Sequence, residues 1–109
     1  MYLKSINPAT AKIIRSHKIH SKKEITYILG DTVKAQTKWA NTSLEYRLNY
    51  ITRIKSTLLD QKHEISILIT KEMGKPINQS ITEIEKCALL CEYYLRNSNK
   101  LLKNKTVHT

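Results

Sequence analysis

Apolar and polar residues first follow a β-compatible pattern and then, for most of the chain, recur at helical spacing. Between Leu3 and Ile19, extended segments lie on either side of a polar turn, Asn7-Pro8-Ala9-Thr10. Pro8 has no backbone donor and favours an extended conformation at Asn7. The amino-terminal pattern therefore predicts a short β-hairpin.

The first helical segment begins with a capping box formed by Ser21 and Glu24. Helical spacing after this box predicts a helix from about Lys22 to Ala40. Gly30 lies in its middle and costs about 1 kcal/mol relative to alanine, which predicts a weak or bent helix at Gly30-Asp31. The apolar positions of this helix are Ile25, Ile28, Leu29, Val33, Trp39 and Ala40.

Three further helical segments follow. A second capping box of Thr42 and Glu45 opens one of them. The next runs to Gly74, a candidate left-handed cap, before Pro76. A last helix is predicted from about Asn78 to Leu102. Their apolar faces are Leu44, Leu48, Ile51, Ile54, Leu58 and Leu59; then Ile65, Leu68, Ile69 and Met73; then Ile81, Ile84, Ala88, Cys91, Leu95 and Leu102.

These elements predict a mainly α fold with a short amino-terminal β-hairpin, in which residues 1–109 form at most one domain. Only two Gly and two Pro occur in the chain, and no linker, internal repeat or low-complexity segment separates the helices. A pattern of this kind defines a small helical protein without assigning its function.

The formal net charge of +10 changes this picture little. Such a charge favours polyanions, but the basic residues are spread from Lys4 to Lys105, and only Lys22 and Lys23 are adjacent. Nucleic-acid interfaces usually cluster their basic residues on one face. We therefore do not expect nucleic acid as the partner.

The hydrophobic pattern also bears on membranes. No apolar run approaches the roughly 20 residues needed to cross a bilayer, and Met1-Tyr2-Leu3-Lys4 lacks the apolar core of a signal peptide. We expect a cytoplasmic protein that does not enter a membrane.

Four segments, in order and at the expected distances, resemble the start of the aldehyde dehydrogenase family. They are SINPAT at 5–10, WANTSLEYRLNYI at 39–51, KEMGKPINQS at 71–80 and EIEKCALLCEYY at 83–94. The last segment looks most like the succinate-semialdehyde dehydrogenase branch. The resemblance covers almost the whole chain, and it departs from the family pattern at Ala11, where the family usually has glycine. Alanine at a position of positive φ is strained.

The resemblance implies a hairpin and a layer of helices that pack on the cofactor-binding domain of an α/β dehydrogenase. It also implies that the NAD or NADP loop, the glutamate base and the cysteine nucleophile lie later in a longer chain. This chain has isolated glycines, Gly30 and Gly74, and no glycine-rich phosphate turn. We therefore assign no catalytic, cofactor-binding or metal-binding residue, and no cofactor, to residues 1–109 themselves.

Several residues nevertheless invite a functional interpretation. Cys87 and Cys91 lie four residues apart on a predicted buried helical face, where ordinary reduced thiols are expected rather than a nucleophile. Trp39 is expected to fill a core position rather than to bind a ligand, and packing rather than base stacking is expected for the pair Tyr93-Tyr94. The scattered histidines do not suggest a metal site, and solvent exposure is expected for the first two; the four are His17, His20, His63 and His108.

Three hypotheses about function follow. The first is an inactive amino-terminal fragment of an aldehyde dehydrogenase, with a decaying gene as one origin. The second is a subunit of a split NAD(P)-dependent enzyme, completed by a separately encoded chain. The third is a basic binding module that uses the charge of +10.

Overall fold

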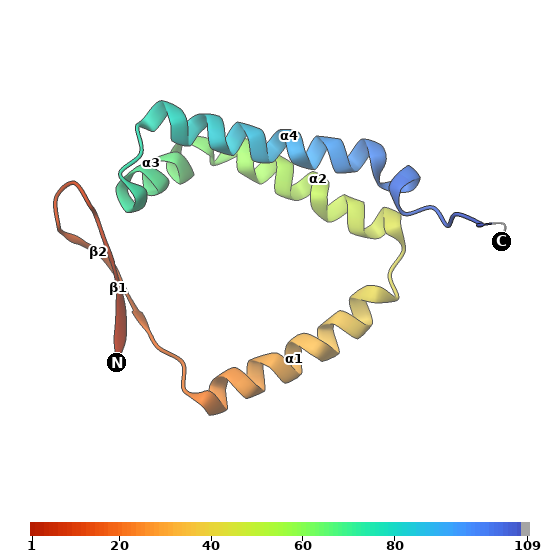
Figure 1. Ribbon diagram of the computed structural model, residues 1–109, viewed down its shortest axis with the longest axis horizontal. Helices are drawn as coiled ribbons and strands as arrows, with labels where there is room; N and C mark the ends of the chain where they lie inside the picture. Colours follow the sequence, from red (N-terminus) through yellow and green to blue (C-terminus); the bar gives the residue numbers. More distant parts are fainter. Residues whose placement is uncertain (108–109) are drawn as a thin grey trace.

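A computed structural model of the protein describes residues 1–107 and contains a two-stranded sheet and four helices. The elements follow the chain as β1 (Tyr2–Ile6), β2 (Ile13–Lys18), α1 (Lys22–Ala40), α2 (Leu44–Asp60), α3 (Lys62–Met73) and α4 (Ile77–Leu101). The predicted mainly α fold with an amino-terminal hairpin is confirmed. Figure 1 shows α2 and α4 side by side, α3 at one end of them, and α1 extending away from this group.

The hairpin is antiparallel and closes through a hydrogen-bonded turn. Ser5 pairs with Arg15, whereas Ile6 pairs with Ile13, so the register shifts between the two pairs. The Asn7 side chain accepts hydrogen bonds from the amides of Ala9 and Thr10, at 2.9 and 3.3 Å. Ala11 has a φ of 56°, as expected where the family has glycine.

Helix α1 begins at the predicted capping box. The amide of Glu24 donates to the Ser21 side chain, and the Glu24 carboxylate accepts from the Ser21 amide at 2.7 Å. These hydrogen bonds, the backbone one first, lower the pKa of Glu24. The helix continues without interruption through Gly30, so the predicted weakness does not break it.

The start of α2 differs from the predicted one. Ser43, not Thr42, is the N-cap, and its hydroxyl accepts from the Tyr46 amide at 3.1 Å. Thr42 instead donates its hydroxyl to the Trp39 carbonyl at 2.7 Å. The predicted N-cap was wrong by one residue. Thr42 and Ser43 are both favourable N-cap residues, but the Thr42 hydroxyl is bonded to the end of α1.

The packed part of the molecule consists of α2, α3 and α4. In residues 1–107 only Ile84 and Ala88 are buried hydrophobic residues. Three serines are buried with them: Ser66, Ser80 and Ser98. Ser66 and Ser98 satisfy their hydroxyls on carbonyls four residues earlier, and the Ser80 hydroxyl meets that of Thr70 at 2.9 Å. Small side chains of this kind let the helices approach closely.

Helix α1 has no buried residue in its range, 22–40, although its apolar stripe is present. Ile25 is 47 % exposed, Ile28 46 % and Leu29 60 %. The predicted faces of α2 and α3 are also only partly covered, since Ile54, Leu59, Leu68 and Met73 are exposed. Sequence periodicity correctly predicted the apolar stripes, but in the described residues the stripe of α1 is left uncovered and those of α2 and α3 are covered only in part.

The molecule is extended for its size. Its radius of gyration is 19.2 Å, whereas a compact domain of this length has about 13 Å. Its accessible surface is 9506 Å², compared with about 6,200 Å² for a compact monomer of the same mass. In the described part of the chain, no helix is long and apolar enough to cross a membrane.

Candidate functional site

Two of the sequence segments that carry the family resemblance meet in the structure. The Ser5 hydroxyl donates to Oε1 of Glu72 at 2.6 Å. The Pro8 ring lies against Gly74, where an added Cβ would come within 3.0 Å of Pro8 Cγ. Gly74 has a φ of 69° and ends α3, so the predicted left-handed cap is confirmed. These contacts attach the hairpin to the α3–α4 corner, and their role is structural.

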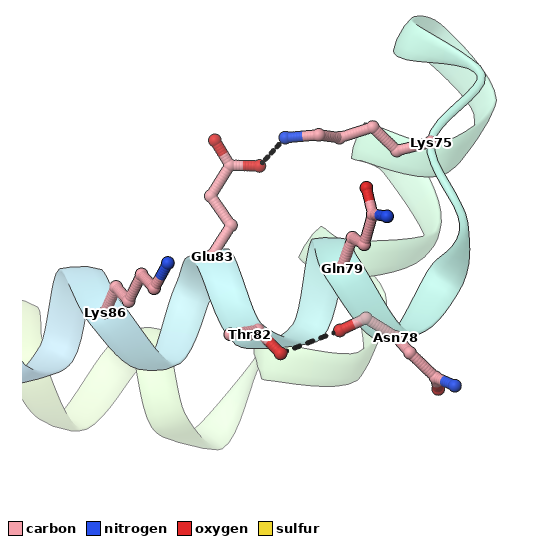
Figure 2. A pocket seen from close by; sticks show the side chains of 6 residues that line it. All are labelled: Lys75, Asn78, Gln79, Thr82, Glu83 and Lys86. Carbon is pink, nitrogen blue, oxygen red and sulfur yellow. Dashed lines mark hydrogen bonds and ion pairs between the residues drawn. The ribbon is translucent and has the colours of Figure 1, made fainter.

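A polar recess of about 530 Å³ lies beside the start of α4 and is the first candidate for a binding site. It is lined by Lys75, Asn78, Gln79, Thr82, Glu83 and Lys86. Figure 2 shows Glu83 extending to Lys75, with an ion pair of 2.6 Å. The Thr82 hydroxyl donates to the Asn78 carbonyl. The Thr82 hydroxyl is bonded to a backbone carbonyl and Glu83 is paired with Lys75, so the recess offers polar contacts but no nucleophile hydrogen-bonded to a base.

An aromatic cluster joins α1 to α2. Trp39 packs edge-on against Tyr50, with ring centroids 5.2 Å apart, and more loosely against Tyr46. The Tyr46 and Tyr50 hydroxyls share a hydrogen bond of 2.9 Å, which raises the pKa of Tyr46. Trp39 is 38 % exposed, so the predicted core position was wrong. It lies at an outer corner because α1 turns away from the other helices.

The cysteines differ from each other in exposure. Cys91 is half-buried, in line with the predicted near-core position, but Cys87 is exposed, so its predicted burial was wrong. The covered stripe of α4 is narrow and centres on Ile84 and Ala88, which leaves Cys87 at its margin. Both thiols are free.

Tyr93 and Tyr94 pack against each other, and both are only partly covered in the described residues. Their exposed fractions are 50 % and 46 %, and their rings contact each other edge-on at 5.4 Å. Consecutive residues point about 100° apart on a helix, so the two rings cannot both face α2.

The first two histidines, His17 and His20, are exposed as predicted, and so is His63. His108 lies outside the described residues. Within residues 1–107 no group of three or more His, Cys, Asp or Glu side chains is placed to hold a metal ion. That the chain binds no metal stays a prediction.

The described residues do not fit a nicotinamide dinucleotide. A dinucleotide cradle needs glycines between a strand and the amino terminus of a helix. The segment between β2 and α1, residues 19–21, has no glycine. Gly30 lies inside α1, and Gly74 caps the carboxyl end of α3, where carbonyls rather than amides are free. We therefore derive no cofactor chemistry from this chain.

The ion pairs form a network that the sequence analysis did not foresee. Glu92 accepts from Lys55 on α2 and from Arg96 on its own helix, the second at 2.8 Å. The hydrogen bond from Lys55, then that from Arg96, lowers the pKa of Glu92. The Glu92–Arg96 spacing was readable as an i,i+4 pair. The Lys55 contact was not, because it depends on how α2 and α4 pack.

Comparison with known proteins assigns the chain to a family. The sequence profile described as "Aldehyde dehydrogenase family" matches residues 1–109. The fold and the contacts between the resembling segments are consistent with this match. The protein belongs to the aldehyde dehydrogenase family.

Individual relatives within the family share about 30 % of their aligned residues with this chain. The chain is 33 % identical over 99 residues to the succinate semialdehyde dehydrogenase [NAD(P)+] Sad of Escherichia coli, covering 91 % of this chain and 21 % of that one. It is 29 % identical to a probable succinate-semialdehyde dehydrogenase [NADP(+)] of Synechocystis, covering 100 % and 24 %. It is 33 % identical to a 1-pyrroline-5-carboxylate dehydrogenase of Bacillus pumilus, covering 96 % and 21 %.

The chain spans about a fifth to a quarter of the length of these relatives. The similarity to succinate-semialdehyde dehydrogenases, expected from residues 83–94, is confirmed. A 1-pyrroline-5-carboxylate dehydrogenase matches at the same identity as Sad, however. The substrate of this protein is therefore a matter for proposal.

Proposed function

We propose that residues 1–109 form the amino-terminal helical segment of the cofactor-binding domain of an aldehyde dehydrogenase, of the succinate-semialdehyde type. The segment contributes a packing layer to an NAD(P)-dependent enzyme in the cytoplasm, and it oxidises no aldehyde by itself. The observation that carries this proposal is the family match over the whole chain. It is supported by helical faces that stay uncovered in the described residues.

The chemistry of aldehyde oxidation explains why the segment alone is inactive. A thiolate must attack the carbonyl, donors must stabilise the oxyanion, and a nicotinamide must accept the hydride. Cys87 and Cys91 lie in the middle of a helix, and neither is among the residues that line the polar recess. Neither matches the cysteine motif of the family, and no dinucleotide cradle accompanies them in residues 1–107.

A chimaera tests the proposal. In E. coli Sad, the first fifth of the chain is replaced by residues 1–109 of this protein. The reduction of NAD(P)+ with succinate semialdehyde is then followed. We expect activity from the chimaera and none from the 109-residue chain alone. Turnover by the isolated chain would contradict the proposal, as would a folded but inactive chimaera. Intact Sad is the positive control.

A second candidate is a split enzyme, in which a separately encoded chain supplies the rest of the fold. It is favoured by the large apolar surface of this chain, which a partner would cover. Translation of the DNA beyond the Thr109 codon in three frames, followed by co-expression, tests it. A glycine-rich cofactor domain with a cysteine nucleophile in a separate frame, and activity on co-expression, are the expected findings.

A further inference from the structure

Two free thiols lie one helical turn apart near the middle of α4. Cys87 is exposed and Cys91 is half-buried, and neither takes part in a disulfide. Helix α4 is continuous from Ile77 to Leu101, so two residues four positions apart share one face of it. The proposed function uses neither thiol, although Cys87 is open to solvent.

The helix holds the two cysteines too far apart for a disulfide between them. Residues at this spacing have Cβ atoms about 5–6 Å apart, whereas a disulfide requires about 3.5–4.5 Å. Closing that gap would distort α4, because its backbone hydrogen bonds fix both Cα positions. The same separation suits a single metal ion that bonds to both sulfurs through thiolate bonds of about 2.3 Å. The pair is therefore arranged as a chelate rather than as a disulfide.

The number of ligands indicates which metal ion the pair suits. Structural zinc sites take four ligands, and within residues 1–107 no group of three or more His, Cys, Asp or Glu side chains is placed to hold a metal ion. A site of two thiolates requires an ion of low coordination number. Thiolates select soft ions such as Cu(I), and Cu(I) is satisfied by two of them in a nearly linear arrangement. Cu(II) favours nitrogen and oxygen ligands instead.

The surroundings of the pair offer no competing ligand on the same face. Ala88 is buried next to Cys87, and Leu90, which lies between the two cysteines in the sequence, is 55 % exposed. One turn before Cys87 on this face is Glu83, whose carboxylate is paired with Lys75 at 2.6 Å. Two thiolates one turn apart repel each other, whereas their complex with Cu(I) carries a single negative charge. The metal complex is therefore favoured over the doubly ionised pair.

We propose that Cys87 and Cys91 form a site for one Cu(I) ion, which both sulfurs bind across one turn of α4. Binding breaks two S–H bonds and forms two Cu–S bonds. Both protons go to solvent, and neither copper nor sulfur changes its oxidation state. The site goes beyond the proposed function. It also departs from the expectation that the chain has no metal ligand, which considered sites of four ligands and the scattered histidines.

Competition for Cu(I), with a matched thiol control, tests the proposal. The reduced 109-residue chain is titrated with Cu(I) under anaerobic conditions in the presence of bicinchoninate, whose coloured complex reports the copper that the protein has not bound. The variants are Cys87→Ser, Cys91→Ser and Cys91→Ser combined with Leu89→Cys. The combined variant keeps two thiols but places them about 200° apart around the helix. Leu89 is 68 % exposed, so its replacement leaves the core intact. Circular dichroism verifies equal helicity.

We expect the wild-type chain to bind one Cu(I) per monomer. All three variants should bind Cu(I) at least about 100-fold more weakly, because the second Cu–S bond no longer forms within one face of the helix. Bound Cu(I) should also raise the midpoint of thermal unfolding of the wild-type chain, because the ion binds the folded helix. The midpoints of the three variants should stay unchanged at the same copper concentration.

Several results would overturn the proposal. Equal affinity of the wild type and the combined variant would show that any two thiols suffice. Wild-type affinity in Cys87→Ser or Cys91→Ser would show that one thiol suffices, and failure of the wild-type chain to compete with bicinchoninate would exclude the site. One Cu(I) per two chains, with a dimer in size-exclusion chromatography that Cys87→Ser abolishes, would show instead that the exposed thiol links two copies.

Discussion

The backbone conformation of Ala11 is strained in the hairpin turn. Ala11 has a φ of 56°, a conformation that costs an alanine about 1–2 kcal/mol relative to glycine. Its amide is nevertheless held by the Asn7 carbonyl at 2.8 Å, so the turn persists. The sequence predicted this strain because the family has glycine at the corresponding position.

Replacing Ala11 by glycine is expected to stabilise the hairpin. Glycine removes the strain but loses more entropy on folding, so the net gain is up to about 1 kcal/mol. Hydrogen exchange at the Asn7 and Ile19 amides, both bonded in the hairpin, should slow by up to about five-fold. Ala9→Gly is the control: the φ of Ala9 is not positive, and exchange should become faster. Faster exchange in Ala11→Gly would contradict the account.

Glu92 gives the chain an acid-sensitive contact. Its pKa is lowered by Lys55 first and then by Arg96. The contribution of this contact to folding stability is therefore fully present above the usual titration range of a glutamate. It is lost as the pH falls through the lowered pKa of Glu92. Neutral-pH stability should accordingly exceed stability in acid.

The variant Glu92→Gln should lower stability at neutral pH and reduce its dependence on acid. Urea unfolding of both proteins at a series of pH values from 7 downwards measures this, and the difference between the two curves should shrink as the pH falls. Adding Lys55→Gln to Glu92→Gln should change the pH dependence no further. A constant difference between wild type and Glu92→Gln at every pH would exclude the ion pair as its cause.

The two glycines differ in whether a side chain would fit at their positions. Gly30 lies inside α1, where an added Cβ meets nothing within 4 Å. Gly74 ends α3 with a φ of 69° and touches Pro8. An alanine therefore fits the first position and is strained at the second.

Gly30→Ala is expected to increase the helicity of α1 and to stabilise it by about 1 kcal/mol. Gly74→Ala is expected to destabilise the α3–α4 corner by about 1–2 kcal/mol, with a further loss from the contact with Pro8. Far-ultraviolet circular dichroism and urea unfolding measure both effects. Similar effects of the two substitutions would show that the backbone conformation at Gly74 is unimportant.

Element boundaries were largely predictable because they depend on local chemistry. Ser21 with Glu24, and Gly74 before Pro76, mark helix ends by hydrogen bonds and φ preference, and the structure has these ends. Burial was less predictable. Cys87, Trp39 and Tyr94 were expected to be covered, but the spacing of residues along a helix does not state whether another element covers a given side chain. Coverage depends on long-range packing, and so do the Pro8–Gly74 and Lys55–Glu92 contacts.

The molecule as a whole has a small core. Within residues 1–107, Ile84 and Ala88 are the buried hydrophobic residues, and α1 packs against no other element to the extent that α2, α3 and α4 do. Hydrophobic burial is the main term that offsets chain entropy. Marginal stability of the isolated chain follows.

The isolated chain is therefore expected to unfold over a broad temperature range. Trp39 fluorescence reports the α1–α2 corner, whereas circular dichroism reports all helices, and the two transitions should not coincide. Binding of a hydrophobic dye before heating should reveal the exposed apolar faces. A single sharp transition, identical by both probes, would show that the chain is an independent cooperative domain.

The contact between Pro8 and Gly74 closes a ring in the path of the chain. The hairpin tip meets the end of α3, and everything between them, including α1 and α2, forms one long loop. The entropy of closing such a loop rises only slowly with its length, by about 0.6 kcal/mol for each doubling. An insertion between β2 and α1 is therefore expected to lower the stability of the fold only slightly. The same topology makes this closure a late event in folding, after the local helices have formed.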